Sequence, residues 1–223
     1  MSDRLDLTGK NSEQAQVELE SGLNGLAGNA SLEVIADFDL RVLLPALQEK
    51  KWGGFNWFPL EDGPTCWRVD LTRLDPEVSP RGIEELYSFD HRRCDDIFIL
   101  VETAAQAGDI DKAQKSFAEF LLGMNHHFSM EEDGFFPAFE QATGMTQGPT
   151  MVMRMEHQQM RGLFTQMQEA VDKGDSEGIS RITSTLMVVM RQHNIKEEQM
   201  LYRMGGMHLS SEADALLRKV QAL

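Results

Sequence analysis

Two short stretches of this chain each place a histidine and a glutamate four residues apart. They are His127 with Glu131 and His193 with Glu197. On a helix this spacing puts an imidazole and a carboxylate on one face, one turn apart. Because both side chains are common metal ligands, each stretch can supply two ligands to a metal centre.

Two further histidines precede these stretches at a constant distance. His91 lies 36 residues before His127, and His157 lies 36 residues before His193. A shift of 66 residues therefore carries the first set of candidate ligands onto the second. A repeat with a constant offset indicates a duplicated supersecondary unit.

The elements that must position these residues are four long helices. From Ile83 onward, apolar residues recur with a helical period in four segments, separated by turns at 108–109, 148–149 and 174–175. All four histidines and both glutamates fall on the apolar stripes, and the fourth stripe continues through Met200 and Met204. Short turns between long helices favour an up-down-up-down four-helix bundle. Pro137 should bend the second helix, because it cannot donate a hydrogen bond to the carbonyl of Asp133.

A bundle of this kind would bury imidazoles and carboxylates in an apolar core. Each such group costs several kcal/mol to bury unless something satisfies it. A metal would satisfy all of the predicted ligands, which are His91, His127, Glu131, His157, His193 and Glu197. Imidazole and carboxylate without thiolate suit iron, manganese or zinc and leave that choice open. Two carboxylates that can bridge suggest two metals.

The other two histidines do not fit the inward pattern. His126 is adjacent to its stripe, and His208 lies beyond Gly205-Gly206. We expect both on the surface. Tyr87 and Tyr202 lie within about a turn of the predicted site, and core packing is the simplest interpretation of both.

The first 75 or so residues predict short strands and helices in the order βαβαββ. The expected strands cover 5–7, 31–36, 55–60 and 66–71, and the expected helices cover about 12–23 and 40–50. Pro76, Pro80 and Gly82 then interrupt both kinds of periodic structure. We therefore expect an α+β chain with a domain at 1–75, a linker at 76–82, and a bundle with a short C-terminal helix at 83–223.

Composition excludes several kinds of partner. The formal net charge is -15 at pH 7, and no basic patch is present to neutralise phosphates. We therefore expect neither nucleic acid nor an anionic membrane as a partner. No apolar run approaches the ~18 residues of a membrane span, so we expect a soluble, cytoplasmic protein. Cys66 and Cys94 lack a CxxC spacing and should be free thiols.

The N-terminal part resembles a known small fold. The order of its elements, the opening Leu5-Asp6-Leu7 and the segment Gly63-Pro64-Thr65-Cys66-Trp67-Arg68-Val69 are similar to the sulfur-carrier (TusA-like) fold, and more closely to a relative found fused to hemerythrin domains. Sulfur carriers of this fold have a Cys-Pro pair just after the first strand, where this chain has Asn11-Ser12. Without a thiol nucleophile there is no sulfur relay. We expect an interaction or regulatory role, with an unidentified protein partner.

The candidate ligands themselves carry a second resemblance. His91, His127-xxx-Glu131, His157 and His193-xxx-Glu197, together with Glu131-Glu132 and Phe136-Pro137, resemble the hemerythrin (HHE cation-binding) family over about residues 83 to 205. The resemblance implies a non-haem di-iron centre, about two irons per chain, in which each glutamate bridges the two irons.

One position departs from the oxygen-carrying members of that family. They have a fifth histidine four residues after the third, where this chain has Arg161. A protonated arginine cannot coordinate a metal, so we expect that position to be open or filled by another group. Asp95, one turn after His91, is a candidate extra ligand or a carboxylate that orients a histidine. Weaker candidates of the same kind are Glu132, Glu156 and Glu198.

Two functional hypotheses follow. The first is a non-catalytic protein whose di-iron centre binds or senses O2, NO or iron itself. The second is a di-iron enzyme that acts on O2, peroxide or NO. We prefer the first, because no residue pattern indicates a substrate pocket or a paired acid and base beyond the ligands. A purely structural metal is the third option, and it predicts no exchangeable ligand position.

Overall fold

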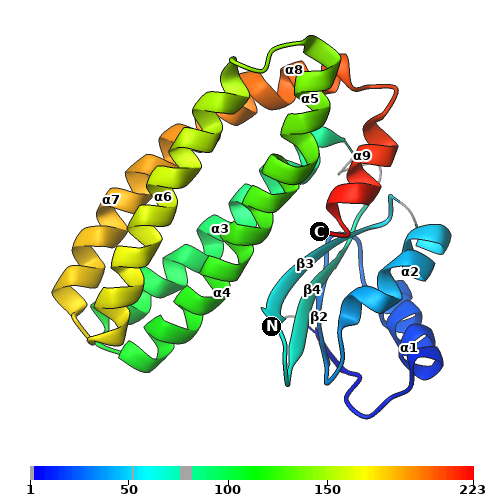
Figure 1. Ribbon diagram of the computed structural model, residues 1–223. Coiled ribbons are helices and arrows are strands. Elements are labelled where there is room, and N and C mark those ends of the chain that lie inside the picture. Colours follow the sequence, from blue (N-terminus) through cyan, green and yellow to red (C-terminus); the bar gives the residue numbers. More distant parts are fainter. Residues whose placement is uncertain (1–2, 52, 76–81) are drawn as a thin grey trace.

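The chain consists of a small α/β layer followed by a long helical bundle (Figure 1). The structure is a computed structural model that describes residues 3–51, 53–75 and 82–223. Of the predicted linker at 76–82, only Gly82 lies within the described residues. The expected α+β architecture and its order of elements are confirmed, and whether the two parts fold independently stays a prediction.

The N-terminal layer is built on a four-stranded sheet. Its elements are β1 (Asp3–Asp6), α1 (Ser12–Gly25), β2 (Ser31–Ala36), the short 3₁₀ helix η1 (Leu40–Leu43), α2 (Leu44–Lys51), β3 (Phe55–Asp62) and β4 (Trp67–Arg73). The strand order is β1-β2-β4-β3, with β1 and β2 parallel and the other pairs antiparallel. Asn11 begins α1 with a capping box, in which its side chain accepts from Gln14 N at 2.9 Å.

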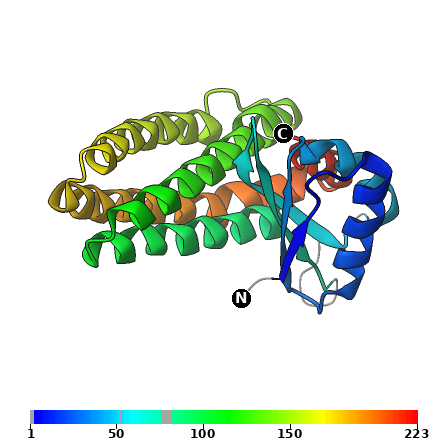
Figure 2. The same cartoon turned by 90° about the horizontal axis from the view of Figure 1, so that it is seen from below.

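The sheet is covered on both faces. Helices α1 and α2 pack on one face, over a core that includes Leu19, Leu47 and Trp57. The opposite face lies against the bundle, as Figure 2 shows from below. Phe58 of β3 is fully buried and belongs to a cluster of bundle residues. The sheet is therefore the middle layer between two sets of helices.

Four long helices form the bundle. They are α3 (Ile83–Gln106), α4 (Ile110–Ser129), α6 (Pro149–Asp172) and α7 (Ser176–Lys196). The two hairpins turn in the same way. Gly108 and Gly174 have positive φ angles of 72° and 63°, and Asp109 and Asp175 then cap the next helix. The predicted repeat is thus visible as two equivalent helical hairpins.

Both hairpins widen into a π-helical turn beyond their second long helix. In the first, η2 (Met130–Phe135) leads into α5 (Phe136–Thr143); in the second, η3 (Glu197–Leu201) leads into α8 (Tyr202–His208). Pro137 lies in the first turn of α5, and the Asp133 carbonyl accepts a 2.8 Å hydrogen bond from Lys219 Nζ. Lys219 belongs to α9 (Ala213–Val220), the predicted short C-terminal helix.

The wide turn in the second hairpin corrects the predicted fourth stripe. We expected Met200 to face the core, and it is 46% exposed, whereas Leu201 and Tyr202 are buried. A π turn takes up one more residue than an α turn, so it rotates the following residues relative to a regular helical period. The stripe therefore holds through Glu197 and fails at Met200, whereas Met204 is partly buried against the core.

Candidate metal centre

The structure brings all of the predicted principal ligands together in the bundle core. Their elements are α3 for His91, α4 for His127, η2 for Glu131, α6 for His157, α7 for His193 and η3 for Glu197. Each of the six side chains is at most 4% exposed. The four long helices thus each contribute a histidine, and the two π turns contribute the carboxylates.

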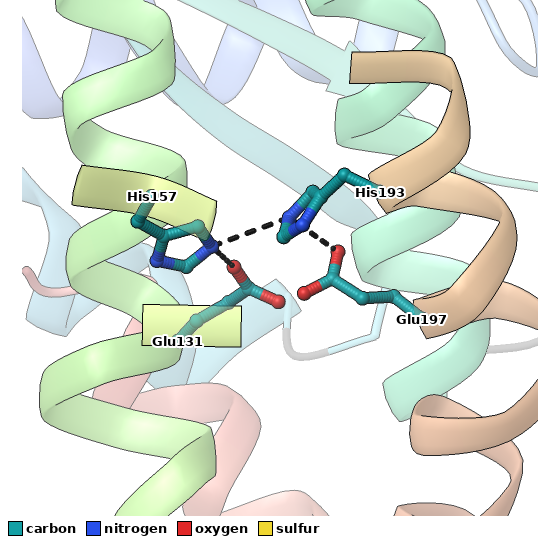
Figure 3. Close-up of side chains that lie close together, drawn as sticks. All are labelled: Glu131, His157, His193 and Glu197. Carbon is teal, nitrogen blue, oxygen red and sulfur yellow. Dashed lines mark hydrogen bonds and ion pairs between the residues drawn. The ribbon is translucent and has the colours of Figure 1, made fainter. Parts of the chain in front are cut away.

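The contacts among these residues are short. Figure 3 shows His157 and His193 turned toward each other, with Nε2 atoms 3.2 Å apart. The Glu131 carboxylate lies 3.2 Å from His157 Nε2, and the Glu197 carboxylate lies 3.1 Å from His193 Nε2. These four residues form one compact ligand group, whose donor atoms all lie within 4.8 Å of one another.

A second ligand group adjoins the first. It consists of His91, His127 and Glu197, again with donor atoms within 4.8 Å of one another. Glu197 belongs to both groups, and its Oε2 atom lies 3.3 Å from His91 Nε2. Glu131 also approaches the second group, because its Oε2 atom lies 3.5 Å from His127 Nε2. The arrangement suits two neighbouring ions with carboxylates between them.

The hydrogen bonding of the core supports a metal at this place. His127 Nε2, Glu131 Oε2 and Glu197 Oε1 are buried and have no hydrogen-bond partner among the described residues. A buried polar atom without a partner carries the full cost of its desolvation. All three atoms belong to predicted ligands, so the residues present fit a bound metal.

Comparison with known protein families agrees with this geometry. The Hemerythrin HHE cation binding domain matches residues 83–205, more than half of the chain. The chain belongs to the hemerythrin HHE cation-binding family. Comparisons with curated proteins and with solved structures gave no match. The match begins at α3, so the resemblance of the N-terminal layer to the TusA-like fold stays a prediction. Within the described residues, no helix is long and apolar enough to cross a membrane.

In this hemerythrin-family protein, each candidate ligand histidine bonds through its Nδ1 atom to a carboxylate on the side away from the other candidate ligands. The four pairs join Nδ1 of a histidine to a carboxylate oxygen: His91 to Glu198 at 2.9 Å, His127 to Asp90 at 2.9 Å, His157 to Glu132 at 2.6 Å and His193 to Glu156 at 3.0 Å. Such a bond fixes which ring nitrogen faces the metal and orients the ring. Glu132, Glu156 and Glu198, which we considered only weak candidate ligands, therefore orient the histidines.

Asp90, which bonds to His127 Nδ1, is the residue of the candidate site that the sequence did not indicate. We named Asp95 instead, and Asp95 is exposed on α3 and belongs to neither ligand group. The 66-residue repeat contained the signal, because it carries Asp90 onto Glu156 and Glu132 onto Glu198. The pairs obey the same symmetry. Each hairpin contains one pair, His127 with Asp90 in the first and His193 with Glu156 in the second. The other two pairs connect the hairpins.

Burial and these carboxylates set the protonation of the metal-free site. Burial opposes a charge on His91, but its bonds to Glu197 and Glu198 outweigh that effect and raise its pKa to about 10. Burial likewise opposes a charge on His157, yet Glu131 and Glu132 raise its pKa to about 9. In the metal-free protein, protons therefore occupy ring nitrogens that a metal would take.

Tyr202 also contacts the ligands. Its hydroxyl lies 2.8 Å from Glu131 Oε1, 2.9 Å from Glu197 Oε2 and 3.3 Å from His91 Nε2. Burial, together with the charge of Glu131, raises its pKa well above the usual value, so Tyr202 stays protonated. Tyr87 stacks on Tyr202 with ring centroids 5.0 Å apart, and its hydroxyl donates to the Met130 carbonyl. Tyr87 is thus a core-packing residue, as expected. Tyr202 is also buried in the core, but its hydroxyl contacts three of the candidate ligands.

Arg161 does not lie among the ligands. Its guanidinium forms two hydrogen bonds with Glu132, of 2.9 and 3.0 Å, and lies over the Phe128 ring. Glu132 is the carboxylate that holds His157. Arg161 is therefore connected to the candidate ligands through Glu132.

The expectation that His126 is a surface residue is wrong. His126 is 8% exposed and lies edge-on to Phe58 of the sheet, with ring centroids 6.2 Å apart. Burial lowers its pKa to about 4, so it is neutral. It lines a cavity of about 190 Å³ between the sheet and α4, and none of the six ligand candidates lines that cavity. His208, by contrast, is exposed as expected.

Proposed function

We propose that this protein carries a non-haem di-iron centre that binds or senses O2, NO or iron itself. The observation that carries the proposal is the pair of buried ligand groups that share Glu197. One ion would be held by His157 and His193 and the other by His91 and His127, with Glu197, aided by Glu131, between them. Imidazole and carboxylate ligands suit iron, and also manganese or zinc; the choice of iron rests on the hemerythrin resemblance.

Six side chains are too few to fill two ions that accept up to about six ligands each. Positions for an exchangeable small ligand therefore remain. When bound, two irons would supply those positions and the electrons that a diatomic gas accepts. Arg161, at the position of the fifth histidine of the oxygen-carrying members, does not fill such a position, because its guanidinium is hydrogen-bonded to Glu132.

The surroundings of the site favour binding over turnover. Phe128 stacks on the His157 ring at 4.0 Å and Phe136 at 5.8 Å between centroids, which excludes water from that side. The carboxylates on Nδ1 hold each histidine in a fixed orientation. A rigid, apolar enclosure of this kind suits a small uncharged ligand such as O2 or NO.

The test is elemental analysis of protein purified without added metal, combined with absorption spectra recorded without air and after addition of air or NO. We expect about two irons per chain and a new charge-transfer band with at least one gas. A single spectroscopically silent zinc would contradict the proposal and indicate a structural site.

One observation favours the enzyme as the second candidate. The Tyr202 hydroxyl is a protonated donor within 2.9 Å of both carboxylates, so it can pass a proton toward the centre. Such an enzyme would act on O2, peroxide or NO. Rapid and repeated consumption of peroxide or NO by the iron-loaded protein, lost in Tyr202→Phe, would support this candidate. A single stoichiometric uptake of gas would support the binding protein.

A further inference from the structure

The carboxylate behind His127 differs from the other three. Asp90 is completely buried, whereas Glu132, Glu156 and Glu198 are partly exposed. Asp90 Oδ2 lies 2.9 Å from His127 Nδ1, and Asp90 Oδ1 accepts a 2.6 Å hydrogen bond from Arg93 Nε. The position of this carboxylate is therefore set jointly by a ligand histidine and by Arg93.

Arg93 in turn lies against the N-terminal sheet. Its guanidinium carbon is 4.6 Å from the centre of the Phe58 ring on β3, in a cation–π contact. Its Nη1 atom is buried and has no hydrogen-bond partner among the described residues. The charge of Asp70 on β4 also acts on Arg93. The cations that hold the corresponding carboxylates in the bundle, Arg161 and Lys196, belong to the bundle itself.

Helix α4 has a glycine, Gly123, at the point where the Arg93 guanidinium packs against it. Gly123 lies in the interior of α4, where glycine costs roughly 1 kcal/mol relative to alanine. A Cβ atom at this position would lie 3.0 Å from Arg93 Nη2 and 3.3 Å from Nη1. The missing side chain therefore leaves room for a charged group that packs between two helices and a sheet.

We propose that Arg93 is a positioning residue through which the N-terminal sheet controls the metal centre, by the sequence of contacts Phe58, Arg93, Asp90 and His127. A displacement of β3 moves the guanidinium, which moves Asp90 and so changes the orientation and basicity of the His127 imidazole. A partner that binds the N-terminal layer would thereby change the ligand environment of the metal without contacting the metal. This inference rests on the proposed metal site, though not on the identity of the metal as iron.

Co(II) is a suitable probe, because its visible bands respond to the ligand field and do not require a gas. The full-length protein is compared with Arg93→Met, Arg93→Lys and Phe58→Leu. The matched control is Arg68→Met. Arg68 of β4 also crosses the interface, 3.7 Å from Glu119 of α4, but has no contact with Asp90. Each variant is titrated with Co(II) after its fold has been checked by circular dichroism.

We expect Arg93→Met to shift the Co(II) bands and to weaken binding of the metal by about 10- to 100-fold, as changes behind a ligand histidine do. Arg93→Lys should restore part of both. Phe58→Leu should shift the bands in the same direction, and the double variant should show less than the sum of the two effects. Arg68→Met should leave the bands unchanged.

The coupling must also act in the opposite direction, because a free-energy coupling between two sites is reciprocal. Loading with Co(II) should slow amide exchange in β3 and β4 of the native protein, and much less so in Arg93→Met. Bands and exchange that are the same in native protein, Arg93→Met and Phe58→Leu would overturn the inference. If Arg93→Met does not fold, Phe58→Leu alone decides the question. Native protein that takes up no metal at all would instead overturn the proposed function.

Discussion

The Arg161 guanidinium donates two hydrogen bonds, of 2.9 and 3.0 Å, to the two carboxylate oxygens of Glu132. A planar guanidinium is well suited to this two-point contact, and a flexible ammonium is not. The arginine lies where oxygen-carrying relatives are expected to have a ligand. Here its side chain contacts Glu132, the carboxylate that is bonded to His157.

Removal of this guanidinium should therefore weaken the metal site without abolishing it. In Arg161→Met, Glu132 loses two of its donors, and the Nδ1 bond to His157 becomes less constrained. We expect about tenfold weaker metal binding, with the stoichiometry unchanged. Competition with a chelator measures the affinity. A variant that loses a whole equivalent of metal would show that Arg161 has a more direct role.

The neighbouring residues Glu197 and Glu198 should respond very differently to the same change. Glu197 belongs to both ligand groups, so Glu197→Ala should reduce metal content from two ions per chain to below one. Glu198 is partly exposed and only holds His91 from behind, so Glu198→Ala should keep both ions with weaker affinity. Elemental analysis of the two variants is the measurement. Equal metal content in both would disprove the assignment of Glu197 as the shared ligand.

Tyr202 and Tyr87 form another matched pair. Tyr202→Phe removes a donor from two buried carboxylates, which should destabilise the metal-free protein by about 1–3 kcal/mol. Bound metal would satisfy the same oxygens, so the loss should be smaller in loaded protein. Tyr87→Phe removes only the bond to the Met130 carbonyl, and its cost should not depend on metal. Urea denaturation with and without metal tests this, and a metal-independent loss in Tyr202→Phe would contradict it.

Protons and metal should compete for the site. The pKa values of His91 and His157 are raised to about 10 and about 9, above the usual value near 6.5. A raised pKa in the folded state gives stability that is complete below the unfolded pKa and lost as pH rises through the folded pKa. The metal-free protein should therefore become less stable between about pH 6.5 and pH 10, while metal affinity increases over the same range. Thermal unfolding at several pH values, with and without metal, measures both. A metal-free protein that gains stability toward pH 10 would contradict the assignment.

The sequence indicated which histidines and glutamates gather in the bundle core, because the helices that carry the histidines are regular up to the π turns. His91, His127, His157 and His193 obey a 3.6-residue period on helices whose other buried positions are mostly apolar. The helical period breaks at Glu197–Leu201, because a π turn adds a residue that a regular 3.6-residue repeat does not contain. Met200, expected in the core, is therefore 46% exposed.

The position of the N-terminal layer was the larger omission. A helical stripe indicates one buried face, and α4 has two, since the bundle core covers one and the sheet covers the other. His126 lies on the second face, against Phe58, so its environment depends on a sheet about 60 residues earlier in the chain. Local periodicity contains no information about a contact of that kind.

The two π turns bear on the history of this chain. Turns of this width are rare in helices, yet η2 and η3 stand at equivalent places in the two hairpins, each directly around a candidate metal-binding glutamate. Two independent origins of the same irregularity at the same position would be a coincidence. The most economical order of events is that a single ancestral hairpin already had the wide turn when it was duplicated.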